Sequence, residues 1–139
     1  MLSKPKPSAT NRCLKIIDNP VNAFRQTHTP ENELRQIMSK TSFKDLINSE
    51  IPVLIDFYAD WCGPCKALAP VIQQVKSSLG DKVRIVKIDV DQNPQISQKL
   101  QIRSIPTLMI FQQGEVKWRA MGVQSLQTIR NELEKLQPV

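Results

Sequence analysis

Three short apolar runs dominate the hydrophobic pattern of the chain, and each predicts a buried strand. They are IPVLIDFYA (51–59), KVRIVKIDV (82–90) and PTLMIF (106–111). Apolar residues follow one another in these runs instead of alternating with polar ones, which is typical of strands covered on both faces. A weaker run, ELRQIM (33–38), predicts a further short strand nearer the N-terminus.

Between the strands, the apolar spacing changes to that of amphipathic helices. The predicted helices cover residues 43–47, 68–79, 94–100 and 125–137. Ser42 and Asp45 form a capping-box pattern at the start of the first helix. Gly80 is a suitable stop for the second helix.

The polar stretch QQG (112–114) separates PTLMIF from another strand-like run, EVKWRAM (115–121), and predicts a hairpin. The elements then follow in the order β-α-β-α-β-α-β-β-α. Alternating strands and helices favour an α/β fold with a parallel sheet covered on both faces. We therefore predict a central mixed sheet, made of parallel strands plus a C-terminal antiparallel hairpin, flanked by helices on both faces.

Residues 1–30 do not continue this pattern. They hold four prolines, many small polar residues and a net charge of +4, out of +6 for the whole chain. We expect a flexible, basic N-terminal extension here, followed by one domain over residues 31–139. Two alternatives stay open. In the first, CLKIID (13–18) forms a short strand or docks on the domain. In the second, the basic stretch serves as an organellar transit peptide.

The composition is ordinary for a globular protein, with 139 residues of which 40% are hydrophobic and 23% charged. No apolar run approaches the ~20 residues of a membrane span, and residues 1–30 lack the apolar core of a secretory signal. The basic residues are scattered with few aromatic residues between them, so we expect no nucleic-acid partner. We predict a monomeric protein of the cytoplasm, a compartment in which structural disulfides are rare.

The stretch ADWCGPCKALAP (59–70) places Cys62 and Cys65 where the first long apolar run ends and a helix begins. A structural zinc site needs four ligands, commonly two such pairs or one pair with histidines. The chain adds only Cys13 and His28, both remote in sequence, so we expect no metal. The odd total of three cysteines also argues against a disulfide framework.

A redox centre fits the cysteine pair better. Cys62 is predicted to lie at the N-terminus of the helix, where free N–H groups and the macrodipole lower the pKa of a thiol. Cys65 follows one turn later, within reach of a disulfide, and Gly63 and Pro64 fix a tight turn between the two. In this scheme Cys62 attacks a substrate disulfide, and Cys65 then attacks Cys62 to release the reduced substrate.

Asp56 is the most informative charge in the chain, because it interrupts the apolar run 51–59. A buried carboxylate is costly unless it is paired or has a task, and burial raises its pKa toward neutrality. Lys87 interrupts the neighbouring strand run. Two compatible roles stay open for Asp56: proton exchange near neutral pH, and a structural ion pair.

The sequence WCGPCK (61–66) at a strand-to-helix junction, followed by Pro70 and by IPT (105–107), resembles the thioredoxin family. The resemblance covers about residues 31–139, in the order of elements of that family. It implies the thioredoxin fold and a protein-disulfide reductase that needs no metal or organic cofactor.

The resemblance also implies roles for the residues around the cysteine pair. Asp56 accepts the proton of Cys65, with Lys87 as the partner of Asp56. Pro106 is a cis proline that presents the backbone of Ile105 to a bound peptide. The residues implied for the shallow apolar surface around the nucleophile are Trp61, Gly63, Pro64, Ile105, Pro106, Gly122 and Val123.

Three positions depart from the family pattern. Tyr58 stands where many members have tryptophan, and Ser104 and Val123 replace a common glycine and alanine. These changes remove no chemical part of the predicted site.

The resemblance further implies that a thioredoxin reductase supplies the electrons and that clients of the ribonucleotide reductase, peroxiredoxin and methionine sulfoxide reductase types receive them. Such a protein maintains the redox balance of the cell. The alternatives are a thiol oxidase of an oxidising compartment and a non-enzymatic binding subunit with the same fold. The Gly-Pro dipeptide between the cysteines resembles the reducing branch of the family, and retention of both cysteines and Asp56 favours an enzyme.

Overall fold

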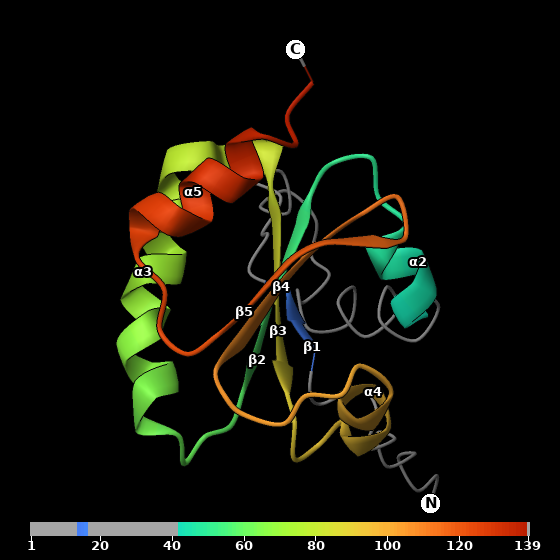
Figure 1. The fold of residues 1–139 in the computed structure, drawn as a ribbon, viewed down its shortest axis with the longest axis vertical. Helices are drawn as coiled ribbons and strands as arrows, with labels where there is room; N and C mark the ends of the chain where they lie inside the picture. The colour runs from blue at the N-terminus through green and yellow to red at the C-terminus, as the bar shows by residue number, and fades with distance from the viewer. Residues whose placement is uncertain (1–13, 17–41, 139) are drawn as a thin grey trace, which may run out of the picture.

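Five strands form one mixed sheet in the order β1-β3-β2-β4-β5 (Figure 1). The computed structural model describes residues 14–16 and 42–138. The strands are β1 (Leu14–Ile16), β2 (Val53–Tyr58), β3 (Arg84–Asp89), β4 (Thr107–Gln112) and β5 (Glu115–Met121). The three long apolar runs and EVKWRAM form strands, as predicted. The strand predicted at residues 33–38 lies outside the described residues.

Helices cover both faces of this sheet, as predicted. They are α2 (Phe43–Ile47), α3 (Gly63–Leu79), α4 (Pro94–Lys99) and α5 (Leu126–Glu134), with a short 3-10 helix, η3, at Gly80–Lys82. Figure 1 shows α3 and α5 on one side of the sheet and α2 and α4 on the other. None of the helices in the described part of the chain combines the length and the apolar character that a membrane crossing requires.

Only one pair of neighbouring strands in the described residues is parallel, β2 with β3, and the other three pairs are antiparallel. The mixed sheet is therefore as predicted, but β4 is antiparallel to β2 where the alternation of elements favours a parallel strand. The difference arises at α4. Six helical residues extend only about 9 Å, which is too short to cross the sheet. The chain therefore enters β4 at the same end of the sheet at which β3 finishes. Thr107, the first residue of β4, accordingly lies opposite Phe57 near the end of β2.

Strand β1 belongs to the extension that we expected to be flexible. Leu14–Ile16 pairs antiparallel with residues 86–88 of β3, at the edge of the sheet. For these three residues the alternative is correct, in which part of CLKIID forms a short strand docked on the domain. The other residues of the extension lie outside the described ones, so its character and the division at residue 30 stay predictions.

The two faces of the sheet are buried in separate apolar clusters. Successive side chains of a strand point to opposite faces, so β2, whose six residues are all buried, contributes to both clusters. Leu54 belongs to the cluster that contains Leu68 of α3, and Phe57 belongs to the one that contains Leu46 of α2. Asp56 shares the face of Leu54 and is fully buried among these apolar neighbours.

The capping box predicted for α2 is present. The Ser42 hydroxyl accepts a hydrogen bond from the backbone N–H of Asp45 at 3.2 Å, and the Asp45 carboxylate accepts one from the backbone N–H of Ser42 at 3.2 Å. We expect Ser42→Ala to lower the free energy of unfolding by about 1 kcal/mol, because an N-terminal N–H of the helix loses its partner.

Urea denaturation at pH 7 measures this change. Ser77→Ala is the matched control, because Ser77 is exposed inside α3 and alanine is the better helix former there. If both variants lost the same free energy of unfolding, the capping hydrogen bonds of Ser42 would contribute no more to stability than an ordinary exposed serine hydroxyl.

Candidate active site

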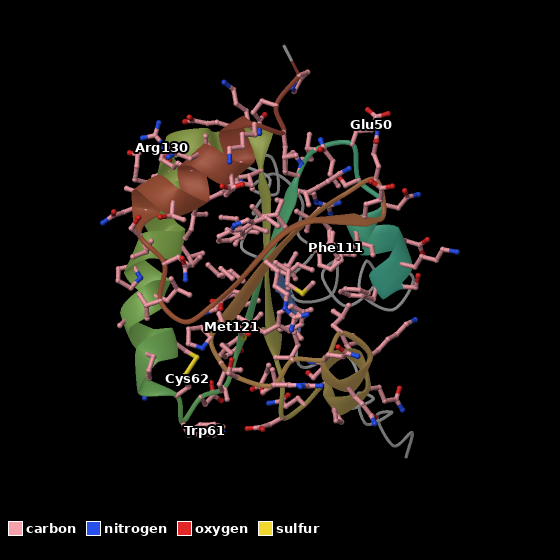
Figure 2. All side chains as sticks on the ribbon, viewed as in Figure 1. Glu50, Trp61, Cys62, Phe111, Met121 and Arg130 are labelled. Carbon is pink, nitrogen blue, oxygen red and sulfur yellow. A yellow bond between two sulfur atoms is a disulfide. The ribbon has the colours of Figure 1, made fainter. Side chains whose placement is uncertain are left out.

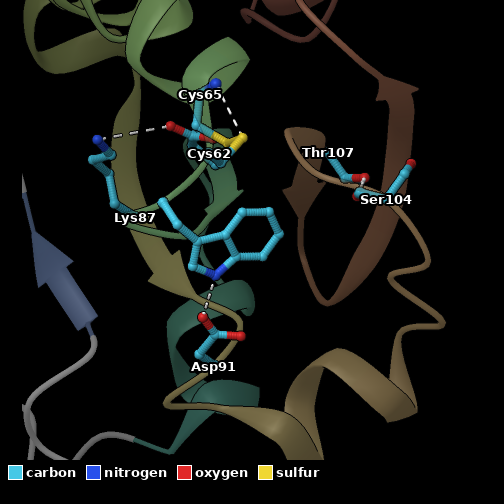
Figure 3. The surroundings of a disulfide bond; sticks show 8 residues. Cys62, Cys65, Lys87, Asp91, Ser104 and Thr107 are labelled. Carbon is cyan, nitrogen blue, oxygen red and sulfur yellow. Dashed lines mark hydrogen bonds and ion pairs between the residues drawn. A yellow bond between two sulfur atoms is a disulfide. The ribbon is translucent and has the colours of Figure 1, made fainter.

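The carboxyl end of β2 leads through a short loop into the N-terminus of α3, and this junction carries the cysteine pair. Cys62 is the N-cap residue of α3, and Cys65 lies in its first turn. The two residues form a disulfide with their Cα atoms 5.3 Å apart (Figure 3). The sulfur of Cys62 accepts a hydrogen bond from the backbone N–H of Cys65 at 3.2 Å. In the dithiol state such an N–H stabilises negative charge on this sulfur, which suits Cys62 to nucleophilic attack.

Gly63 and Pro64 begin the helix itself and do not form a separate turn before it. Proline suits this position, because the first helical N–H groups have no acceptor within the helix. Gly63 has no positive φ, and a Cβ added to it meets no atom within 4 Å. Neither space nor backbone conformation therefore requires glycine here.

Apolar groups surround the disulfide. Tyr58 and Ala59 form a cluster with the two cysteines, and Ile105 packs against it. Each cysteine is only 4% exposed. A second molecule can therefore reach the sulfur atoms only from a restricted direction.

Trp61, directly before Cys62, is 71% exposed. Its indole N–H donates a hydrogen bond to the Asp91 carboxylate at 2.7 Å. Figure 2 shows Trp61 next to Cys62 at one end of the molecule. The bond to Asp91 fixes the orientation of a large apolar side chain that solvent surrounds on most sides.

Asp56 lies opposite Lys87 in the parallel register of β2 and β3. It is fully buried, and neither of its carboxylate oxygens has a hydrogen-bond partner. The Lys87 ammonium lies 4.0 Å from Oδ2, which is ion-pair distance but too long for a hydrogen bond. Loss of hydration raises the pKa of Asp56 to about 6, and the positive charge of Lys87 offsets part of that rise.

A cavity of about 170 Å³ lies beside Cys65 and Lys87. This volume has room for several water molecules. The residues that line it are Tyr58, Ala59, Asp60, Cys65, Lys66, Ala69 and Lys87. Cys65 and the partner of Asp56 therefore share one solvent-accessible space.

Ile105 and Pro106 precede β4, and the peptide bond between them is cis, as the resemblance implies. Ile105 packs against the disulfide cluster. Gly122 donates its backbone N–H to the carbonyl of Pro106 at 2.8 Å and has a φ of 81°, which favours glycine. Val123, the next residue, is 50% exposed. Contacts thus link Ile105 to the cysteines and Gly122 to Pro106.

Three further residues near the site were not assigned a role from the sequence. Asp91 holds Trp61, and Met121, which is 64% exposed, is the last residue of β5 and lies opposite Thr107. The ring of Tyr58 lies 4.6 Å from the Lys87 ammonium. Only Tyr58 gave a signal in the sequence, as a departure from the family pattern. Asp91 comes close to Trp61, and Met121 to Thr107, only when the chain has folded.

The described residues contain no group of three or more histidine, cysteine, aspartate or glutamate side chains that could hold a metal ion.

The family model described as Thioredoxin matches residues 35–135. The chain belongs to the thioredoxin family. Thioredoxin from Rickettsia felis is 41% identical over 99 residues, which cover 70% of this chain and 94% of the relative. Thioredoxin 1 from Chlorobaculum tepidum is 47% identical over 92 residues, which cover 66% and 91%. Mitochondrial thioredoxin 3 from Saccharomyces cerevisiae, solved in its oxidised form, is 31% identical with a TM-score of 0.61, covering 67% of this chain and 86% of that one.

Family membership and the disulfide of Cys62 and Cys65 together identify the chain as a thiol–disulfide oxidoreductase. As a member of the thioredoxin family, it reduces disulfides by cycling these cysteines between dithiol and disulfide. A reductase supplies its electrons, and disulfide-containing proteins receive them. The fold and the reductase function predicted from the sequence are confirmed, in preference to an oxidase or a non-enzymatic subunit.

Proposed function

We propose that Asp56 is the proton acceptor for Cys65 and that Lys87 keeps Asp56 suited to this task. The supporting observation is a carboxyl that is fully buried, has no hydrogen bond and has one ammonium at 4.0 Å. With a pKa of about 6, this carboxyl is ionised at pH 7 and still accepts a proton more readily than an ordinary aspartate. A purely structural ion pair would gain from the hydrogen bond that is missing here.

The reaction consists of two exchange steps. In the first, the thiolate of Cys62 attacks one sulfur of the client disulfide. The client S–S bond breaks, a bond between Cys62 and the client forms, and the other client sulfur leaves as a thiolate that takes a proton from solvent.

In the second step, Cys65 gives its proton to Asp56 through water, and its sulfur attacks the sulfur of Cys62. The Cys62–Cys65 disulfide forms, and the second client sulfur leaves as a thiolate. Two electrons have then passed from the dithiol to the client, and the reductase must return two electrons before the next cycle.

Clients dock, in this proposal, on the apolar surface around the nucleophile. The exposure of Trp61 and Val123 supports this, because large exposed apolar side chains beside a reactive group are typical of docking surfaces. An extended client segment would pair with the backbone of Ile105. The residues proposed to form this surface are Trp61, Gly63, Pro64, Ile105, Pro106, Gly122 and Val123.

The proposed electron donor is a thioredoxin reductase, with NADPH as the ultimate source. The proposed acceptors are clients of the ribonucleotide reductase, peroxiredoxin and methionine sulfoxide reductase types. A solved structure that is 29% identical to this chain, with a TM-score of 0.61, concerns thiol resolution in a yeast mitochondrial 1-Cys peroxiredoxin via glutathione and thioredoxin systems. This similarity supports the peroxiredoxin class.

We place the reaction in the cytoplasm, with the chain acting as a monomer, because cytoplasmic thiols are kept reduced and a reductant of protein disulfides acts there. Two similar solved structures concern mitochondrial proteins, which supports the alternative of an organelle with residues 1–30 as a transit peptide. Fractionation of cells that express the full chain distinguishes the two locations.

Asp56→Asn tests the proposed proton transfer. We expect release of the second client thiol to slow by roughly tenfold to a hundredfold at pH 7, because asparagine cannot accept the proton of Cys65. A peptide disulfide whose two halves carry different fluorophores separates the first release from the second in a stopped-flow experiment. In the unmodified protein the second release should become faster as the pH passes about 6, and the variant should lack this increase.

Asp81→Asn removes an exposed carboxylate in η3 and serves as the matched control. If Asp56→Asn released the second thiol as fast as this control at every pH, Asp56 would be only part of a structural ion pair.

A further inference from the structure

The aromatic ring of Tyr58 lies against the Lys87 ammonium. The ammonium nitrogen is 4.6 Å from the ring centroid, within the ~6 Å over which the face of a ring attracts a cation. Tyr58 is 8% exposed and the Lys87 side chain 23% exposed, so solvent screens this contact only weakly. Neither the exchange steps nor the client surface described above uses this ring.

Strand geometry brings the three side chains together. Asp56 and Tyr58 are two residues apart on β2, so both point to the face of the sheet that α3 covers. Lys87 is the register partner of Asp56 on β3 and points to the same face. The ammonium therefore lies 4.0 Å from the carboxyl and 4.6 Å from the centre of the ring.

The ion pair alone does not explain why the ammonium stays in this place. A lysine ammonium is strongly hydrated and sits on a flexible stem, which normally carries it toward water. At 4.0 Å it makes no hydrogen bond with Asp56 that would compensate for lost hydration. The electron-rich ring face supplies a second attraction, and this attraction strengthens as water is removed.

We propose that Tyr58 is a positioning residue whose ring keeps the Lys87 ammonium beside the Asp56 carboxyl. The inference rests on the proposed role of Asp56 as proton acceptor. Without the ring, the ammonium moves outward and the carboxyl loses its nearest positive charge. The carboxyl then stays protonated to a higher pH, and near pH 6 fewer molecules hold the ionised form that accepts the proton of Cys65.

Other ionisable groups lie on the neighbouring strands or line the cavity, and they stay unchanged in the test. Asp89, on the same face of β3, accepts a hydrogen bond from the backbone N–H of Asp91, and Lys15 lies opposite Lys87 in the backbone register of β1 and β3. Those that line the cavity with Tyr58 and Lys87 are Asp60, Cys65 and Lys66. Lys87 is the group whose charge lowers the pKa of Asp56, so an effect of the ring should pass through it.

Two substitutions separate the ring from the hydroxyl of Tyr58. Tyr58→Leu removes the ring, and we expect it to raise the pKa of Asp56 by about 0.5. Tyr58→Phe keeps the ring, and we expect it to leave this pKa within about 0.2 of the unmodified protein. NMR titration of the Asp56 carboxyl carbon in the oxidised protein gives the pKa, because the cysteines do not titrate in the disulfide.

Phe43→Leu is the control for a general loss of stability. Phe43 packs edge-on against Phe111 in the cluster on the opposite face of the sheet. We expect this variant to lower the unfolding temperature without moving the pKa of Asp56.

The decisive comparison repeats Tyr58→Leu in a Lys87→Met background. If the ring acts through the ammonium, the substitution there changes the pKa of Asp56 by less than about 0.2. A change that persists without Lys87 would overturn the proposal. So would an unchanged or lowered pKa in the Tyr58→Leu single variant, or an equal rise in Tyr58→Phe.

This test stays separate from that of the proton acceptor. A failure of the role of Asp56 appears as unaltered client release in Asp56→Asn, whereas the titration of Asp56 in the disulfide form involves no client and no exchange step.

Discussion

Replacing Cys62 by serine is expected to reduce the rate of disulfide reduction by at least about a thousandfold, as for the loss of an essential nucleophile. Serine still fits the N-cap of α3. Its hydroxyl is not ionised at neutral pH and forms no bond to sulfur, so no mixed disulfide arises. Cys65 is the only other thiol among the described residues, and it is 4% exposed. Reduction of a peptide disulfide, with dithiothreitol as the electron source, measures the loss.

Cys65→Ser should behave differently, because it removes only the second exchange step. We expect the client to remain covalently attached to Cys62, and intact-mass spectrometry detects this adduct. Cys13→Ser is the matched control and should keep the full rate. A Cys62→Ser protein with the activity of this control would show that another group performs the exchange.

The sequence sufficed to locate β2 and α3, and with them the reactive pair. The run 51–59 is apolar on both faces and lies next to a segment of helical spacing. All six residues of β2 are buried, and Cys62 caps α3. Local preference and burial agree at this junction, and the chemistry lies where the strand ends.

The direction of β4 was harder to predict, because it depends on the length of α4 and not on a pattern within β4 itself. A run such as PTLMIF is compatible with either direction. Only the position of Thr107 opposite Phe57 shows that the chain did not cross the sheet. In the same way, the partner of Leu14–Ile16 depends on which sheet edge is free to pair.

Contacts between remote loops and strands carry no local signal at all. Trp61 is hydrogen-bonded to a carboxylate 30 residues away, in the loop that follows β3. The placement of Lys87 close to both Asp56 and Tyr58 depends on the parallel register of two strands, since a shift of one residue would turn the lysine to the other face. The chemical groups are therefore visible in the sequence, but their electrostatic environment is not.

Asp56→Asn is expected to make the protein more stable at neutral pH. The pKa of Asp56 is about 6 in the folded chain, compared with an ordinary value of 3.8. Between these values the folded protein holds a proton that the unfolded chain has released, so the free energy of unfolding falls as the pH rises from about 4 to about 6. Above that range the full cost of the buried carboxylate, about 3 kcal/mol, is present.

Asparagine carries no charge, so the free energy of unfolding of Asp56→Asn should lack this dependence on pH. The difference between the variant and the unmodified protein should therefore grow by about 3 kcal/mol between pH 4 and pH 8. Urea denaturation of the oxidised proteins at intervals of one pH unit measures it, and Asp81→Asn should follow the unmodified protein. Parallel curves for all three proteins would mean that Asp56 titrates normally in the folded chain. A normally titrating Asp56 would be a weaker base for the proton of Cys65, so this stability measurement also tests the proposed mechanism without any client.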